Sequence, residues 1–464
     1  MQRIVTFLNS TTLKKAVLYF ISAYLFLIYG YALLKIPVNG DGGFYLSVAD
    51  AIVEGTVPYK DLYVSYPPVG LYFFAFIRLI TGNTPVYWPY LLSVILLHSI
   101  NAVLIHGISR KICSNYSAIL LGLSYLIIVF HIEGVHIMLE PFVVFFSLLA
   151  TKIYFQEKRT SKQLLLCGIY CGLSFLSKQY GLGSFLLLLF FYSIEVFTRK
   201  LNISSLFIFT SGFFLSIILC LGFLIALDIN LYHLKHQLFG VSYGQHSLHQ
   251  LSSYSIEFFK ETNFLWLIIL ITIFFIWQKK IFQLRLLYLF AAVLGFMLQF
   301  YFQPFKHYGI IMVPFLLLIL AVFFHELNKT GFFKLYPFIL VAIILLFVQK
   351  NARTFRHNIN YWDRKLQYAD AALIHSIMGQ TKAYLPDHPE LYFILDIEPV
   401  DAPKFGFSFS NYLPNKEMEY LLAQTNFVII STLPEALNAY HDAGFFTRFH
   451  VRFQHPRFII FDKK

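Results

Sequence analysis

The chain has 464 residues, of which 58% are hydrophobic and only 13% are charged, and its formal net charge is +12. A soluble globular protein carries about 25% charged residues, so this chain lacks the charge to cover a soluble surface of its size. We therefore expect an integral membrane protein whose basic residues lie in short loops between apolar segments, and we expect no binding to nucleic acid.

Apolar segments long enough to cross a bilayer, which takes about 20 residues, recur along the chain. We predict eleven spans, at residues 16–34, 85–107, 116–131, 136–155, 164–177, 181–198, 206–227, 263–277, 286–303, 308–326 and 332–349. The first apolar segment ends at Leu34 and leads into a polar loop with no small-residue cleavage pattern. We therefore expect this segment to remain as a span.

Lysine and arginine residues predict how the chain crosses the membrane. With the N-terminus in the cytoplasm, the inner loops carry 16 of them and the outer loops carry 7, although the outer loops are longer. This bias follows the positive-inside rule. We expect a multi-pass protein of the plasma (inner) membrane, and an odd number of spans places residues 350–464 outside the cell.

These features predict a polytopic α-helical transmembrane domain at residues 1–349 and a small extracytoplasmic α/β domain at residues 350–464. The transmembrane domain has two long outer loops, at residues 35–84 and 228–262. The first loop contains the aromatic stretch Tyr66–Gly82, which Pro67 and Pro68 open and which Arg78 interrupts. We predict a helix that lies in the membrane interface there.

The C-terminal residues are less apolar and alternate between two kinds of pattern. The patterns favour helices at Asp370–Met378 and Lys416–Gln424, and strands at Leu391–Leu395, Phe427–Ser431 and Phe458–Phe461.

Acidic residues gather at the predicted outer ends of the spans. Asp41 follows the first span and has glycine neighbours, which leave room for a substrate to approach the carboxylate. Taken alone, this pattern is more typical of a polar turn. Glu140 opens the fourth span together with Pro141, which suits the first turn of a helix. A carboxylate at the edge of hydrocarbon needs a task or a partner, although it also favours a helix start electrostatically.

His131, Glu133 and His136 lie close together shortly before Glu140. Their spacing could bind a metal ion, but it fits no known metal motif. We therefore interpret these three residues as interfacial polar groups and predict no metal site.

Two cationic positions face the same side as the acids. Lys178 separates two apolar helices, and Lys306 and His307 separate a later pair. A lone lysine at a helix end commonly extends its ammonium group to the interface. Two such positions near a group of acids could instead hold a phosphate.

This ordered set of motifs resembles the GT-C superfamily of membrane glycosyltransferases, especially the branch of protein O-mannosyltransferases and lipid A aminoarabinose transferases. That branch shows an Asp after the first span, a run ending in Pro-Tyr-x-Asp, a Pro-Pro pair, an acid-Pro pair, a Ser/Thr-Lys at a helix end and a basic-Tyr pair. Here these motifs match Asp41, Ala49 to Asp61, Pro67-Pro68, Glu140-Pro141, Ser177-Lys178 and His307-Tyr308. The aminoarabinose branch carries a Lys before the proline pair, where this chain has Tyr66, so the role of that lysine is not transferred.

The resemblance implies an inverting transfer of a sugar from a polyprenyl-phosphate donor to an acceptor hydroxyl on the outer face of the membrane. Asp41 would be the general base. Lys178, Lys306 and His307 would bind the donor phosphate and stabilise the charge on the departing polyprenyl phosphate. Glu140 could orient the acceptor, assist Asp41 or help to hold a divalent cation.

The remaining expectations concern substrate-binding residues, two acidic residues outside the site, and the acceptor. Asp61, Tyr66 and Tyr308 would contact the substrate. Asp50 and Glu54 are expected on the solvated face of the helix after Gly43. No other cofactor is implied, and the acceptor is left open among a lipid, a glycan and a protein.

Two other functions compete with this interpretation. One is a transporter or flippase for a lipid-linked sugar, for which internal repeats or ionisable sites near the membrane midplane would be typical. The other is a polysaccharide polymerase or ligase. Convergence of Asp41, Glu140 and Lys178 on one outward-facing site would favour an enzyme over a transporter.

Overall fold

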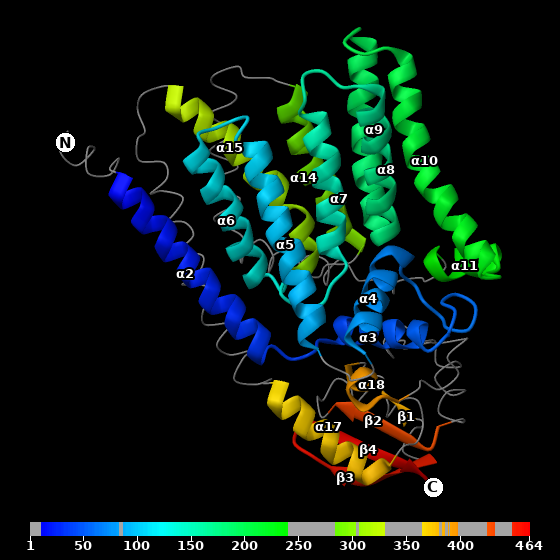
Figure 1. Cartoon of the computed structure of the whole chain (residues 1–464). Coiled ribbons are helices and arrows are strands. Elements are labelled where there is room, and N and C mark those ends of the chain that lie inside the picture. Colours follow the sequence, from blue (N-terminus) through cyan, green and yellow to red (C-terminus); the bar gives the residue numbers. More distant parts are fainter. Residues whose placement is uncertain are drawn as a thin grey trace.

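The computed structural model describes residues 11–82, 87–239, 284–302, 306–329, 364–379, 383–385, 388, 390–397, 425–431 and 448–464. These residues form a helical bundle with a small α/β unit at one end (Figure 1). The helices of the bundle are α2 (Thr11–Lys35), α3 (Gly40–Val53), α4 (Pro68–Thr81), α5 (Trp88–Ser109), α6 (Asn115–His131), α7 (Glu140–Tyr154), α8 (Ser161–Ser177), η1 (Gln179–Gly181), α9 (Leu182–Phe197), α10 (Ile203–Ala226), α11 (Leu231–Phe239), α14 (Leu284–Phe302), η2 (Lys306–Ile311) and α15 (Val313–Lys329). The α/β unit contains α17 (Arg364–Met378), β1 (Ala383–Tyr384), α18 (Glu390–Leu395), β2 (Phe427–Ser431), β3 (Phe449–Gln454) and β4 (Phe458–Lys463).

Each predicted span that falls within the described residues coincides with a helix, from α2 through α5–α10 to α14 and α15. Among the described residues, four helical stretches are long and apolar enough to cross a membrane by themselves: Lys14–Lys35, Trp88–Ser109, Gln179–Phe197 and Ile203–Ala226. The predicted spans at 263–277 and 332–349 lie outside the described residues. The total of eleven spans therefore stays a prediction.

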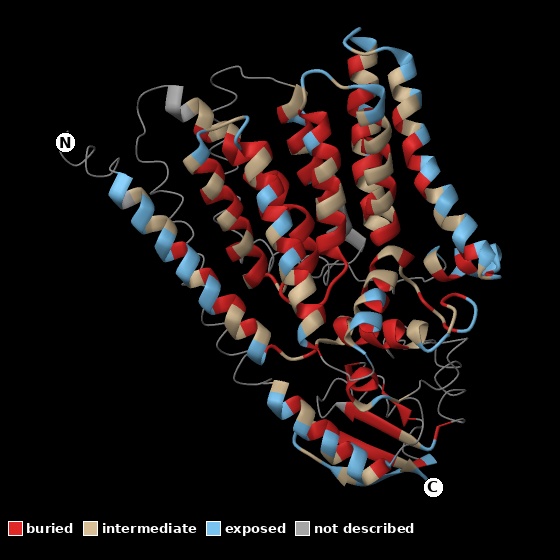
Figure 2. Ribbon diagram, viewed as in Figure 1, coloured by how far each residue is buried: buried red, intermediate tan, exposed pale blue. Residues whose placement is uncertain are grey.

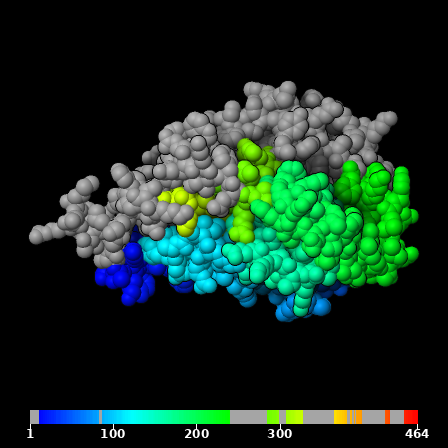
Figure 3. Space-filling model, turned by 90° about the horizontal axis from the view of Figure 1, so that it is seen from above, coloured from blue at the N-terminus to red at the C-terminus, as the bar shows by residue number. Residues whose placement is uncertain are grey.

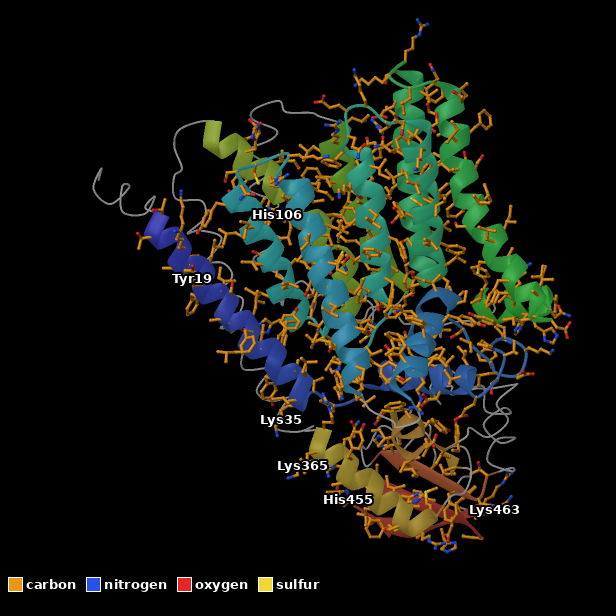
Figure 4. All side chains as sticks on the ribbon, in the orientation of Figure 1. Tyr19, Lys35, His106, Lys365, His455 and Lys463 are labelled. Carbon is orange, nitrogen blue, oxygen red and sulfur yellow. The ribbon has the colours of Figure 1, made fainter. Side chains whose placement is uncertain are left out.

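The long helices α5 to α10 alternate in direction, so their ends gather at two opposite ends of the bundle (Figure 1). Seen from above, the colours run from blue at one edge, where α2 lies, through cyan to green at the other edge, where α8, α9 and α10 lie (Figure 3). The short helices α3 and α4 and the C-terminal unit all lie at the end where α2 finishes (Figure 1). His106 marks the opposite end (Figure 4).

Local sequence accounts for several helix starts. Pro68 and Pro141 occupy first-turn positions of α4 and α7, where proline loses no intrahelical hydrogen bond. The hydroxyl of Thr160 accepts the Gln163 N–H at 3.3 Å, and the Gln163 side chain accepts the Thr160 N–H at 2.9 Å. This capping box satisfies backbone donors at the start of α8.

The bundle buries its central helices and exposes apolar side chains at its edges. Figure 2 shows exposed faces on α2 and α10, whereas α6 and α7 between them are mostly buried or half-buried. The exposed faces carry large apolar groups such as Phe26 and Phe207, which is the pattern of a lipid-facing surface. Helices α8 and α10 approach so closely that a Cβ on Gly168 would lie 1.9 Å from the Phe209 carbonyl oxygen. Small residues at such positions allow helix backbones to pack tightly.

Helices α3 and α4 form the predicted outer loop. The stretch Tyr66–Gly82 contains the predicted helix, as α4. The expectation that Asp50 lies on a solvated face is wrong, because its carboxylate pairs with Arg78 of α4 at 2.6 Å and both side chains are at most 10% exposed. Glu54, one turn further along, is exposed as expected. The sequence alone could not show that α4 folds back to bury Asp50.

The C-terminal unit packs its helices against a four-stranded sheet of order β1-β2-β4-β3. Strands β1 and β2 are parallel, and β4 is antiparallel to both β2 and β3, with Val428 opposite Phe461. The predicted strands at Phe427–Ser431 and Phe458–Phe461 are present, and Asp370–Met378 is helical. Lys416–Gln424 lies outside the described residues.

The strand predicted at Leu391–Leu395 is wrong, because these residues form the helix α18. Leu391, Tyr392, Phe393 and Ile394 are all buried. A short run that is buried on every side has no periodicity to separate a strand from a helix.

Candidate active site

Four segments that are distant in sequence bring charged side chains together at the end of the bundle that carries α3. Asp41 lies in the first turn of α3, Glu140 is the first residue of α7, Lys178 follows α8, and His307 lies in η2. The His307 Nε2 atom is 3.8 Å from Asp41 Oδ2 and 3.8 Å from Glu140 Oε1. Lys178 joins the cluster through Glu140. Asp41, Glu140 and Lys178 therefore belong to one cluster, and the outward orientation of this cluster stays a prediction.

Glu140 and Lys178 form the most buried part of this cluster. The Lys178 Nζ atom donates to Glu140 Oε1 at 2.5 Å, and the two side chains are 2% and 0% exposed, respectively. Three tyrosine rings surround the ammonium group, with centroids 4.5 Å (Tyr308), 5.6 Å (Tyr66) and 5.8 Å (Tyr180) from Nζ. The faces of aromatic rings attract cations. Lys178 is therefore an enclosed, paired cation and does not extend to the interface.

His307 lies among three carboxylates. Its Nδ1 atom is 3.6 Å from Glu133 Oε2, while its Nε2 atom faces Asp41 and Glu140. Burial lowers the pKa of His307, but the contact with Glu133 and the negative charges of Glu140 and Asp41 outweigh it, so the pKa is raised overall. The imidazole is thus held toward its positively charged form, between carboxylates that would otherwise repel one another.

Asp41 is more accessible than Glu140, Lys178 and His307. Its side chain is 25% exposed, whereas those of Glu140, Lys178 and His307 are at most 8% exposed. The local chain explains its place, because the Asn39 side chain accepts the Gly42 N–H at 3.1 Å and so starts α3. Desolvation raises the pKa of Asp41, while His307 and Lys178 oppose this rise. A carboxylate with a raised pKa is a stronger base, which suits it to remove a proton from a hydroxyl group.

The other predicted site residues fall into two groups. Tyr66 and Tyr308 line the cluster through their contacts with Lys178. Asp61 is exposed, and its carboxylate accepts the Val57 N–H at 3.0 Å within its own turn. The side chain of Lys306 lies outside the described residues. The roles of all these residues in binding stay predictions.

Sequence reasoning set aside one residue that the fold brings into the cluster. Glu133 has φ +70°, a left-handed conformation that is uncommon for glutamate, and this conformation accompanies its position beside His307. His131, its sequence neighbour, instead contacts Tyr24 at 3.2 Å. Glu133 joins the cluster through its contact with His307 of η2, which is far away in sequence. The local sequence gives no sign that Glu133 rather than His131 makes this contact. Within the described part of the chain, no group of three or more His, Cys, Asp or Glu side chains is arranged to hold a metal ion.

Part of the sequence matches a known protein family. Residues 65–225 match the family model of dolichyl-phosphate-mannose-protein mannosyltransferases. No curated protein matches the chain in sequence.

Several solved structures share the fold over nearly the whole chain. ArnT from Cupriavidus metallidurans in the apo state has a TM-score of 0.64 at 13% identity and covers 97% of this chain and 98% of its own. The same protein bound to undecaprenyl phosphate has a TM-score of 0.56 at 13% identity, covering 96% of this chain and 97% of its own.

The oligosaccharyltransferase AglB from Archaeoglobus fulgidus, in complex with an inhibitory peptide and a dolichol-phosphate, has a TM-score of 0.56 at 12% identity. The match covers 94% of this chain and 72% of the AglB chain. The chain therefore has the fold of the GT-C membrane glycosyltransferases, and its residues 65–225 carry the sequence pattern of the protein mannosyltransferase branch.

Proposed function

We propose that this protein is an inverting glycosyltransferase that moves a sugar from a polyprenyl-phosphate donor to an acceptor hydroxyl on the outer face of the membrane. The observation that carries the proposal is the convergence of Asp41, Glu140, Lys178 and His307 at one end of the bundle. Sequence match to a mannosyltransferase family supports the reaction class. ArnT binds undecaprenyl phosphate and AglB binds a dolichol-phosphate in their solved structures, which supports this class of donor.

In the proposed reaction, Asp41 accepts the proton of the acceptor hydroxyl, and the oxygen attacks the anomeric carbon from the face opposite the phosphate. The new glycosidic C–O bond forms while the bond between the anomeric carbon and the phosphate oxygen breaks. The electron pair of that bond leaves with the polyprenyl phosphate. Because this leaving group is a stable anion, it needs stabilisation by positive charge rather than a strong general acid.

His307 and Lys178 are the described cations that would supply this positive charge. Lys178 is already bound to Glu140, but an ammonium group has three N–H donors, so one contact leaves two for a phosphate oxygen. Glu140 would hold Lys178 in place, and Lys306 would add charge from the start of η2. Tyr66, Tyr308 and Asp61 would contact the substrates around this centre.

The proposal places the protein in the plasma membrane with a cytoplasmic N-terminus and with residues 350–464 outside. Reporter fusions at Lys464 and within residues 278–285 test this arrangement, which predicts opposite sides for the two reporters. Reporters on the same side would contradict the orientation.

The catalytic proposal is tested by transfer assays in membranes, with a panel of radiolabelled polyprenyl-phosphate sugars. Asp41→Asn keeps the size and polarity of the side chain but removes the base. We expect it to insert and bind donor normally and to lose about a hundredfold to ten-thousandfold in transfer rate. Glu54→Gln is the matched control, because Glu54 is the C-cap residue of the helix that carries Asp41 and is exposed.

Wild-type transfer rates in Asp41→Asn would show that the wrong carboxylate has been chosen. If no member of the cluster matters for transfer, and the protein instead moves intact lipid-linked sugar across the bilayer, the transporter function replaces the proposal. Formation of polymer from the donor sugar would assign the protein to the polymerases.

A further inference from the structure

The C-terminal unit contacts the segment that carries Asp41 on both sides of that residue. Figure 4 shows Lys35, at the C-terminal end of α2, beside the start of α17, where Lys365 lies. Next to it, the Arg364 guanidinium donates to the carbonyl oxygens of Ala32 at 3.2 Å, Leu33 at 2.9 Å and Ile36 at 2.9 Å. The last carbonyls of a helix have no partners within the helix, and a cation there is electrostatically favourable. Arg364 therefore fixes the end of α2.

One turn further along α17, Gln367 holds the link between α2 and α3. Its Oε1 atom accepts the Val38 N–H at 2.9 Å, and its Nε2 donates to the Val38 carbonyl oxygen at 2.9 Å. The Gln367 side chain thus satisfies both backbone groups of a residue that belongs to neither helix. Gln367 is buried, so losing these bonds would leave polar groups without partners and without water.

The third contact follows Asp41 in the chain. Gly43 lies against the first residue of α18, where a Cβ on Gly43 would be 2.2 Å from the Glu390 Cα atom. The two backbones therefore touch without room for any side chain at Gly43. Nearby, the Phe393 ring of α18 packs edge-on against Tyr90, with ring centroids 6.3 Å apart.

We propose that helices α17 and α18 act as a clamp that sets the position of Asp41. The clamp holds Val38, three residues before Asp41, and Gly43, two residues after it. The inference rests on the proposed function, in which Asp41 is the base. A general base must lie within hydrogen-bond distance of the proton that it removes, and a displacement of about 1 Å can cost about a hundredfold in rate. Gln367 and Arg364 would act on Asp41 through the backbone groups that they hold, so they are positioning residues.

The test uses the full chain in detergent or nanodiscs with two readouts. Gln367→Leu removes both hydrogen bonds to Val38 while keeping a side chain of similar size. Hydrogen–deuterium exchange of peptides covering residues 36–46 reports whether the segment is held. Steady-state transfer kinetics report kcat and KM for the donor. The matched control is Ser376→Ala on the same helix, because Ser376 is exposed and its hydroxyl donates only to the Leu373 carbonyl of α17.

We expect Gln367→Leu to speed exchange within residues 36–46 and to lower kcat about tenfold to a hundredfold, with a much smaller change in KM. The control should match the wild type in both readouts. Unchanged exchange would overturn the clamp. Faster exchange with unchanged kcat would overturn the positioning of Asp41.

The two readouts separate the clamp from the proposed function. If the wild type transfers no sugar from any donor, the proposed function fails, and the exchange experiment still decides whether the clamp exists. If Gln367→Leu does not fold, Arg364→Met removes the contacts to the carbonyls of Ala32, Leu33 and Ile36 together with the cation's contact with the Tyr87 ring. This variant is judged by the same two outcomes.

Discussion

Replacing Lys178 by Met removes the ammonium group that lies 2.5 Å from the Glu140 carboxylate, while the length and the apolar stem of the side chain are kept. If Lys178 only held the donor phosphate, as the resemblance implied, such a change would affect donor use more than folding. The structure changes this expectation, because the partner carboxylate has no exposed surface. We expect the loss of Lys178 to destabilise the protein as well as to stop transfer.

The size of the effect follows from the burial of the pair. At an effective dielectric constant of about 20, unit charges 2.5 Å apart attract by about 7 kcal/mol. Desolvation of both groups offsets much of this attraction. Removing one partner of a buried pair nevertheless costs about 3–5 kcal/mol, because the other charge stays buried without compensation. His307, 3.8 Å from the same Glu140 oxygen, compensates in part, so we expect about 3 kcal/mol.

The measurement is thermal unfolding of purified protein in detergent, followed by tryptophan fluorescence and by the fraction that stays monodisperse. Lys178→Met should lower the apparent Tm by about 3 °C, because the unfolding entropy of a chain of this length is about 1 kcal/mol/K. The double variant Lys178→Met/Glu140→Gln leaves no unpaired charge and should recover at least half of that loss. Transfer should stay absent in the double variant, which separates stability from catalysis.

A Tm for Lys178→Met within about 1 °C of the wild type would refute the reasoning. So would a double variant that is no more stable than Lys178→Met. Either result would mean that the ammonium group and the carboxylate do not depend on one another in the folded protein.

Three further predictions concern Asp41, Glu133 and Asp50. The transfer rate should have a bell-shaped pH profile. Activity should be lost as pH falls through the raised pKa of Asp41, and lost again as pH rises through the raised pKa of His307. Glu133→Gln removes a charge that raises both pKa values, so both limbs of the kcat/KM profile should move to lower pH, and an unmoved alkaline limb would contradict the role of Glu133. Asp50→Asn leaves Arg78 buried without its carboxylate partner and should cost about 3 kcal/mol in unfolding free energy. The exposed Glu54→Gln control should lie within about 0.5 kcal/mol of the wild type, and equal stability of the two variants would contradict the buried pair.

The sequence by itself determined the membrane class and the positions of the long helices. Apolar length and helix-start residues are local properties, so the segment at 206–227 could be predicted and is present as α10. Pro141 likewise marked the start of α7. The motif order also indicated that Asp41, Glu140 and His307 belong to one site, although it could not give their contacts.

Only the tertiary structure decided which charges meet. Lys178 and Glu140 are 38 residues apart in the chain and 2.5 Å apart in space, and no local pattern distinguishes a lysine that pairs in the interior from one that reaches the interface. The same holds for Asp50, which the sequence placed in solvent and which Arg78 buries. It also holds for Leu391–Leu395, where burial on every side removed the periodicity that separates a helix from a strand. Helix formation depends on neighbours three or four residues apart, whereas the partner and pKa of a charged group depend on whatever the fold places beside it.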